Sequence, residues 1–255
     1  MQILHYSQQG EGEPLVILHG LFGSGKNWQT LARRFAESYR VYCVDLRNHG
    51  GSFHHQEMTY PAMAEDVGRW LRHLGIEDCR MLGHSMGGKV AMTLSLNSPE
   101  LVSKLIVADI APVVYRHQHD NLIAPILALP LEELPTRAAV DSTLAADIAD
   151  PMLRGFLLQN LYRDGERWGW RVNWAAIQQQ MSALTDFPVA MWDWRIEIPT
   201  LFLRGEASDY IDEEGLQTID WHFSDARVET LPGAGHWLHA EQPGRFHDAV
   251  ISFLG

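Results

Sequence analysis

The chain has 255 residues, of which 46% are hydrophobic and 20% charged, and its formal net charge at pH 7 is −12. This length fits one domain with a large core, or one domain that carries an insertion, and no apolar run reaches the roughly 18 residues that a membrane span needs. The acidic excess repels phosphate backbones and anionic lipids, so we expect neither nucleic acid nor a membrane surface as a partner.

The cellular compartment is predicted from the N-terminus and the cysteines. Residues 1–6 have neither the basic region nor the apolar region of a secretory signal. Cys43 and Cys79 lie within or beside apolar runs, where a buried free thiol is a common core residue and a disulfide is not expected. We therefore expect a cytoplasmic protein; the sequence does not indicate an oligomeric state.

Strand and helix patterns alternate along most of the chain. The continuous apolar run Leu15–Leu18 is typical of a strand buried on both faces of a parallel sheet. The pattern predicts further strands at 40–44, 79–81, 105–108, 200–203 and 227–231, and helices at 27–39, 63–74, 89–94 and 215–223 and at the C-terminus. We expect an α/β fold with a mostly parallel central sheet flanked by helices.

The alternation breaks once, between residues 113 and 196. This stretch contains several prolines, helical patterns and no strand-like run, so we expect a helical cap inserted into a core made of residues 1–112 and 197–255. A tryptophan cluster lies here and fits either a small core for the insertion or a pocket for substrate. Its members are Trp168, Trp170, Trp174, Trp192 and Trp194.

The motif Gly83-His84-Ser85-Met86-Gly87 lies where the strand at 79–81 leads into a helix. Such a corner is tight, so it needs glycine two residues before and two residues after the serine, at Gly83 and Gly87. The serine is held at strained backbone angles that lift its hydroxyl out of the sheet. A lone G-x-S-x-G occurs by chance, so its weight depends on its surroundings. Here the corner between strand and helix predicts Ser85 as a nucleophile.

A serine nucleophile needs a base and N–H donors for the oxyanion. His236 follows the last predicted strand in a glycine-rich loop and comes after Ser85 in the order serine, acid, histidine, so it is the predicted base. The predicted oxyanion donors are the backbone N–H groups of Leu21, which follows His19-Gly20, and Met86. Phosphate-loop and metal-ligand motifs do not accompany the glycines and histidines, so we expect no cofactor and no metal.

Taken together, these motifs resemble the α/β-hydrolase superfamily. The turn after the strand at 40–44 and the segment after Asp109 resemble the branch of bacterial YbfF-type esterases and their mitochondrial ABHD11-type relatives. The resemblance implies hydrolysis of short-chain acyl esters and does not fix a physiological substrate. The segments that carry it are His19-Gly20-Leu21-Phe22-Gly23, Asp45-Leu46-Arg47-Asn48-His49-Gly50, Gly83–Gly88, Asp109-Ile110-Ala111-Pro112-Val113 and Gly233-Ala234-Gly235-His236-Trp237.

The acid that would orient His236 is open at this stage. In the superfamily it usually lies three residues past the glycine that ends the strand at 200–203, and Ser208 occupies that position. Asp109, at the end of the strand at 105–108, is the favoured candidate because several relatives place their acid there. Ser208 as the direct neighbour of His236, and Asp209 after a one-residue shift, are the alternatives.

We therefore predict a serine carboxylesterase that hydrolyses short-chain acyl esters through an acyl-enzyme intermediate, with a small-molecule ester as its partner. Two alternatives use the same residues, namely an acyl-CoA thioesterase and a C–C bond hydrolase. A third, from another class, is a non-catalytic protein that binds a small ligand in the same cavity. Arg47, Asn48 and His49 fit either the wall of the site or a brace for their own turn.

Overall fold

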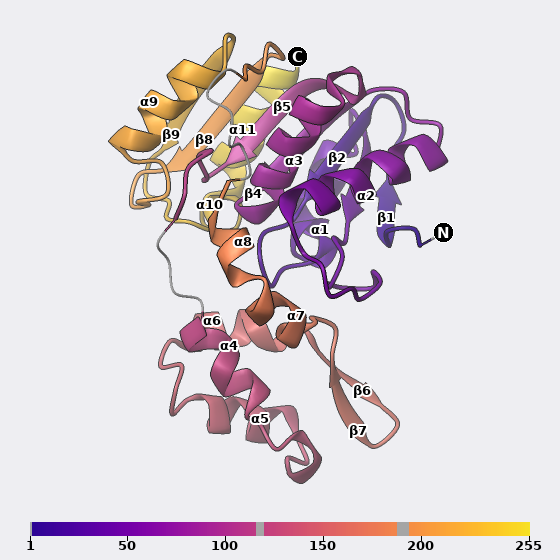
Figure 1. Cartoon of the computed structure of the whole chain (residues 1–255), viewed down its shortest axis with the longest axis vertical. Helices are drawn as coiled ribbons and strands as arrows, with labels where there is room; N and C mark the ends of the chain where they lie inside the picture. The colour runs from indigo at the N-terminus through magenta and orange to yellow at the C-terminus, as the bar shows by residue number, and fades with distance from the viewer. Residues whose placement is uncertain (1, 116–119, 188–193) are drawn as a thin grey trace.

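The computed structural model describes residues 2–115, 120–187 and 194–255. A seven-stranded sheet in the order β1-β3-β2-β4-β5-β8-β9 forms its centre (Figure 1). Every pair of neighbours is parallel except β1 and β3. The strands are β1 Tyr6–Gln9, β2 Pro14–Leu18, β3 Arg40–Val44, β4 Cys79–His84, β5 Val102–Ala108, β8 Thr200–Gly205 and β9 Ala226–Leu231.

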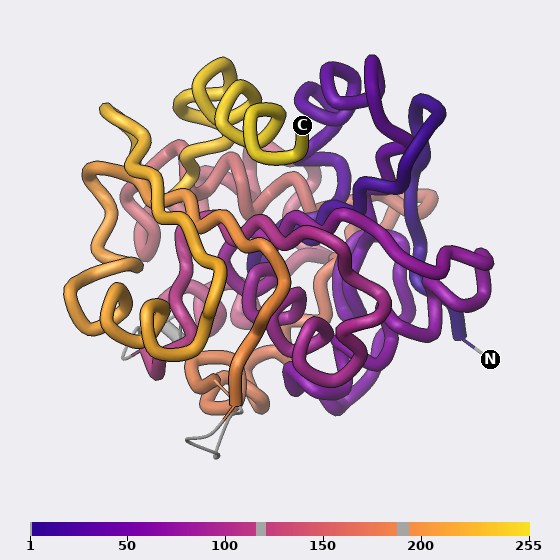
Figure 2. The backbone as a smooth tube through the Cα atoms, turned by 90° about the horizontal axis from the view of Figure 1, so that it is seen from above, coloured from indigo at the N-terminus to yellow at the C-terminus, as the bar shows by residue number. Residues whose placement is uncertain are grey.

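Helices cover both faces of this sheet, and the strand residues alternate between them. On β2, Leu15 and Ile17 pack into the cluster that contains α1 and α11, whereas Val16 and Leu18 pack into the cluster with α2 and α3. Figure 2 shows the C-terminal helix α11 beside α1 on one side of the sheet. The mostly parallel sheet flanked by helices is thus confirmed. The flanking helices are α1 Gln29–Phe35, α2 Tyr60–His73, α3 Met86–Asn97, α9 Glu213–His222, α10 Leu238–Glu241 and α11 Pro243–Leu254, with 3₁₀ turns at η1 Gly25–Trp28 and η2 Pro99–Leu101.

The edge strand β1 was not predicted from the sequence. Its residues Tyr6–Gln9 are mostly polar and half-buried, because one side of an edge strand faces solvent. It pairs antiparallel with β3, from Tyr6 opposite Val44 to Gln9 opposite Val41. A four-residue polar segment gives no apolar run, so the sequence pattern does not identify it.

The inserted segment lies below the sheet in Figure 1 and is mostly helical. The expectation that it holds no strand is wrong at Leu161–Trp170, where two short antiparallel strands form a hairpin. Gly165, with φ 59°, allows the tight turn between them, and both strands contain charged residues, so neither gives an apolar run. The elements are α4 Asp120–Leu127, η3 Leu131–Glu133, α5 Arg137–Leu144, α6 Pro151–Leu158, β6 Leu161–Asp164, β7 Arg167–Trp170, α7 Trp174–Gln179 and α8 Met181–Thr185.

The described tryptophans of this segment pack as core residues. Trp174 is buried against Trp170 and Phe22, with ring centroids 5.6 and 5.0 Å away. Trp168 donates its indole N–H to the Leu134 carbonyl at 2.8 Å, and Trp194 stacks on a histidine of α9 at 3.8 Å. Trp192 lies outside the described residues. These contacts agree with a core for the insertion rather than with a substrate pocket.

The structure also bears on the two cysteines and on membrane-spanning helices. Cys43 and Cys79 are both free and buried. Among the described residues, no helix combines the length and the apolar character required to span a bilayer.

Candidate active site

The corner between β4 and α3 holds Ser85 in a backbone conformation that side-chain-bearing residues rarely adopt, with φ 51° and ψ −119°. A Cβ atom at Gly83 would lie 2.3 Å from the carbonyl oxygen of Gly87, and one at Gly87 would lie 2.4 Å from that of Leu18. Only glycine fits at these two positions. The backbone is therefore forced into a tight bend that presents the Ser85 hydroxyl at the carboxyl edge of the sheet.

Ser85, His236 and Asp109 form one chain of hydrogen bonds. The Ser85 hydroxyl donates to His236 Nε2 at 3.2 Å, and His236 Nδ1–H donates to Asp109 Oδ2 at 2.8 Å. The three residues are brought together from the ends of β4, β9 and β5, which all reach the same edge of the parallel sheet. This arrangement can move a proton from the serine to the imidazole and stabilise the imidazolium that results.

Asp109 is fully buried, and its carboxylate accepts three hydrogen bonds. Besides His236, the Gly205 N–H donates to Oδ1 at 2.9 Å and the Ser208 hydroxyl donates to Oδ2. A buried carboxylate that is hydrogen-bonded in this way keeps its charge at a lower free-energy cost. Ser208 therefore contacts the acid and not the histidine, and Asp209 forms no hydrogen bond to His236 among the described residues. The role of Asp109 in catalysis stays a prediction.

The predicted oxyanion donors lie beside Ser85. Met86 is the first residue of α3, so its N–H lacks a partner within the helix, and the positive end of the helix dipole favours an anion there. Leu21 lies within a turn that is closed by the Gly23 N–H on the Gly20 carbonyl at 3.0 Å. Leu21 and Met86 line one small cavity together with Ser85, a placement that suits a pair of donors.

Two buried histidines, His19 and His49, hold the turn that contains Leu21, a role that was not predicted from the sequence. His49 Nε2 accepts from the Phe22 N–H at 3.1 Å, and His19 Nδ1–H donates to the Gly20 carbonyl at 2.8 Å. Burial lowers the pKa of both, for His49 to about 3, so both rings are neutral and each nitrogen has a fixed role. His19 follows β2 and His49 follows β3, and these two strands are parallel neighbours in the sheet. The position of each histidine after its strand is the signal that could have revealed this role.

The turn after β3, at residues 45–50, holds neighbouring segments in place. The Arg47 guanidinium donates to the Asp66 carboxylate at 2.5 Å, and the Asn48 carbonyl accepts from the Asn173 N–H at 3.0 Å. None of Arg47, Asn48 and His49 lines the two cavities beside Ser85. The turn therefore positions the site and ties it to the inserted segment without touching the reacting centre.

His84 and Tyr210 hold the imidazole of His236, and neither was singled out from the sequence. His84 Nε2–H donates to the His236 carbonyl at 2.8 Å, and burial keeps the pKa of His84 well below its usual value. The Tyr210 ring stacks on the His236 ring with centroids 3.8 Å apart. His236 is thus fixed at its backbone and on one ring face.

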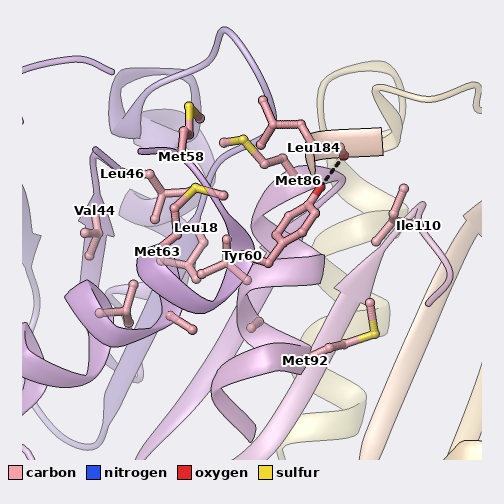
Figure 3. Close-up of a cluster of buried hydrophobic side chains, with 14 of the residues drawn as sticks. Leu18, Val44, Leu46, Met58, Tyr60, Met63, Met86, Met92, Ile110 and Leu184 are labelled. Carbon is pink, nitrogen blue, oxygen red and sulfur yellow. Dashed lines mark hydrogen bonds between the residues drawn. The ribbon is translucent and has the colours of Figure 1, made fainter. Parts of the chain in front are cut away.

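Two cavities meet at Ser85. The larger, of about 280 Å³, is lined by His236 and by mostly apolar residues that include Leu153, Phe156 and Trp237. The smaller, of about 40 Å³, lies on the side of Met86 and does not include His236. Figure 3 shows part of its lining, with Met86, Ile110 and Leu184 around the ring of Tyr60. The Tyr60 hydroxyl donates to the Leu184 carbonyl at 2.7 Å and so links this wall to α2.

Comparisons with known proteins agree with this architecture. Residues 13–243 match the family model described as the alpha/beta hydrolase fold. The chain is 41% identical to the sn-1-specific diacylglycerol lipase ABHD11 of Xenopus laevis over 95% of its length and 80% of the frog protein. It is 35% identical to the esterase YbfF of Escherichia coli strain K12, covering 96% and 94% of the two chains.

A solved structure extends the likeness to three dimensions. The chain superimposes on a marine microorganism esterase with a TM-score of 0.96 at 39% sequence identity, over 99% of this chain and all of the other. The relatives are esterases and lipases, so the chain is an enzyme with hydrolase activity of the esterase or lipase type. The protein belongs to the α/β-hydrolase family, in the branch that contains ABHD11 and the YbfF esterases.

Proposed function

We propose that the protein is a serine carboxylesterase that hydrolyses short-chain acyl esters through an acyl-enzyme intermediate. The observation that carries the proposal is the hydrogen-bonded chain from Ser85 through His236 to Asp109, placed where two cavities of unequal size meet. Its partner is a small-molecule ester, and neither nucleic acid nor a membrane surface is part of the proposal.

The reaction follows from the positions of the atoms. Ser85 Oγ attacks the ester carbonyl carbon while His236 Nε2 takes the serine proton, and the carbonyl oxygen becomes an oxyanion held by the N–H groups of Leu21 and Met86. When the intermediate collapses, the C–O bond to the alcohol breaks and His236 gives its proton to the leaving oxygen. Water, activated by His236, then hydrolyses the acyl group from Ser85, so the cycle needs no cofactor.

The two cavities take different halves of the ester. The leaving oxygen must reach His236, so the alcohol occupies the larger cavity, which contains that histidine. The acyl group occupies the smaller cavity, which contains both oxyanion residues. A cavity needs a volume of about 10–15 Å³ to hold one water molecule. The small cavity, of about 40 Å³, therefore suits an acyl chain of only a few carbons. The apolar lining of the larger cavity suits a bulkier alcohol.

A crossed substrate panel tests this assignment. We expect p-nitrophenyl acetate or butyrate to exceed p-nitrophenyl octanoate in kcat/KM by about tenfold or more, because a filled apolar pocket discriminates by that order per excess methylene. Met181→Ala, in the small cavity, should raise the activity toward the longer acyl chains. Leu153→Ala, in the large cavity, should change the preference among alcohols and leave the acyl preference as it is.

Acyl-CoA substrates belong in the same panel, because the same residues could act on a thioester. A higher kcat/KM for acyl-CoA than for every ester, or for octanoate than for acetate in the unaltered protein, would contradict the proposal.

A further inference from the structure

Lys89 lies on α3, one turn after Ser85, and its side chain is buried, with the residue only 1% exposed. The ammonium group donates to the carbonyl oxygens of Val113 and Asp186, each at 2.8 Å, and to that of Thr185 at 3.4 Å. Val113 precedes the inserted segment's first helix, and Thr185 ends its last one. The side chain of Lys89 thus holds the two connecting segments between core and insertion, one at Val113 and the other at Thr185 and Asp186.

Aromatic rings complete the surroundings of the ammonium. Lys89 Nζ lies 4.6 Å from the ring centroid of Tyr115, 5.5 Å from that of Tyr60 and 5.9 Å from that of Phe187. An ammonium has three donors, and the three carbonyl groups account for them. Lys89 is therefore built to hold backbone, and it offers no further donor to an anionic substrate.

The free-energy cost of this arrangement argues against a purely stabilising role. Burial lowers the pKa of Lys89 to about 7, and the charge of Asp186 opposes the shift without cancelling it. The fold therefore disfavours the charged form of the side chain. An apolar side chain of similar volume is often no less stable at such a position, so stability alone does not explain a lysine there.

The segments that Lys89 holds also form a wall of the small cavity. Tyr115, Leu184 and Thr185 line it, as does Lys89 itself. Leu184, the neighbour of Thr185 in the chain, is held separately by the Tyr60 hydroxyl. The distance between this wall and Ser85 therefore depends on two tethers, one from α3 and one from α2.

We propose that Lys89 is a positioning residue that sets acyl-chain specificity, because it fixes the two connecting segments against α3 and so keeps the small cavity short. This inference rests on the proposed function, since it takes the small cavity as the acyl site. Lys89 acts through the wall and takes no part in the proton transfers at Ser85.

Lys89→Met tests the proposal. It keeps an unbranched side chain of similar volume and removes all three donors, so the freed carbonyl groups should turn toward water and the wall should recede from Ser85. We expect the ratio of kcat/KM for p-nitrophenyl octanoate to that for acetate to rise by about tenfold or more, through a lower KM for octanoate and a higher KM for acetate. The preference among alcohols should not move.

The chain offers a matched control in Lys104. Its Nζ also donates to two backbone carbonyls, those of Phe253 at 3.0 Å and Leu254 at 2.8 Å, and lies 5.5 Å from the Phe253 ring, at a site away from the two cavities beside Ser85. Lys104→Met should alter thermal stability but not the acyl-chain ratio. Tyr60→Phe removes the second tether at Leu184 and should shift the ratio in the same direction as Lys89→Met. It keeps the test available should Lys89→Met not fold.

The outcomes separate the two proposals. If the unaltered protein hydrolyses short esters and neither Lys89→Met nor Tyr60→Phe changes the acyl-chain ratio, the role of Lys89 is refuted and the proposed function stands. An equal shift in Lys104→Met would also refute that role. If the unaltered protein hydrolyses no ester, the proposed function fails first.

The burial of Lys89 also predicts a pH dependence of stability. In the unfolded chain the lysine keeps its proton to about pH 10.4, whereas in the folded protein it loses it near pH 7, so between these values the unfolded state binds more protons and folding gains stability as pH rises. Asp186, Tyr60 and Tyr115 are the ionisable groups that face it, and burial raises the pKa of both tyrosines, so they stay neutral in this range. The Tm of the unaltered protein minus that of Lys89→Met should increase from pH 7 to pH 9. A constant or falling difference would contradict the burial of a titrating lysine here.

Discussion

Replacing Ser85 by alanine is expected to lower kcat for ester hydrolysis by about 10⁴-fold or more, since the acyl-enzyme can no longer form. The proposed nucleophile is a single oxygen on the strained turn between β4 and α3, and the site offers no second hydroxyl that donates to His236 among the described residues. The measurement is the initial rate on p-nitrophenyl butyrate, together with covalent labelling by a fluorophosphonate probe. Both signals should be lost while the circular dichroism spectrum and Tm are kept.

Ser95→Ala is the matched control. Ser95 is a buried serine on the same helix, and its hydroxyl donates to the Ala91 carbonyl at 2.9 Å. Its removal should leave both labelling and turnover in place. Labelling that persists in Ser85→Ala would identify a different nucleophile and overturn the assignment.

Asp109→Asn is expected to lower kcat by about 10³- to 10⁴-fold with the fold intact. The asparagine amide can present an N–H to His236 where the carboxylate presents an acceptor, which favours the tautomer that carries its proton on Nε2. That tautomer cannot accept the proton of Ser85. The variant also loses the charge that stabilises the imidazolium. Steady-state kinetics with a Tm measurement separates this effect from loss of structure, since Asp109 is fully buried.

Two comparison variants decide between the acid candidates. Ser208→Ala removes one of the three hydrogen bonds to the Asp109 carboxylate, so we expect a loss of about tenfold or less. Asp209→Asn should have little effect. A larger loss of kcat in either variant than in Asp109→Asn would show that the acid lies in the loop after β8.

The sequence predicts those parts of the site that depend on local chain geometry. Ser85 and its flanking glycines can be identified because the turn itself excludes other residues, and His236 because it follows the last strand. For the acid, the sequence favoured Asp109 but left Ser208 and Asp209 open, because the contact between Asp109 and Ser208 joins residues 99 positions apart and depends on where the loop after β8 folds. The structure brings both into one hydrogen-bonded group and leaves the catalytic role to experiment.

Buried polar side chains were the hardest to foresee. Lys89 lies in a helix whose residues 86–95 are all buried, although a lysine normally faces solvent, and its ammonium finds its partners on segments distant in the chain, at Val113 and Asp186. The roles of His19 and His49 likewise appear only when β2 and β3 lie side by side. The edge strand β1 and the hairpin of β6 and β7 escaped prediction because polar or charged residues interrupt each strand, so none gives an apolar run.

The carboxylate that supports His236 follows β5, so β8 contributes only the Gly205 amide to it and the loop after β8 only the Ser208 hydroxyl. Among the described residues, no charged side chain of this loop forms a hydrogen bond to His236, so substitutions there can change the cavity lining beside Tyr210 without removing the carboxylate. For engineering, this loop is the place to randomise when new ester preferences are sought, with Ser208 left in place.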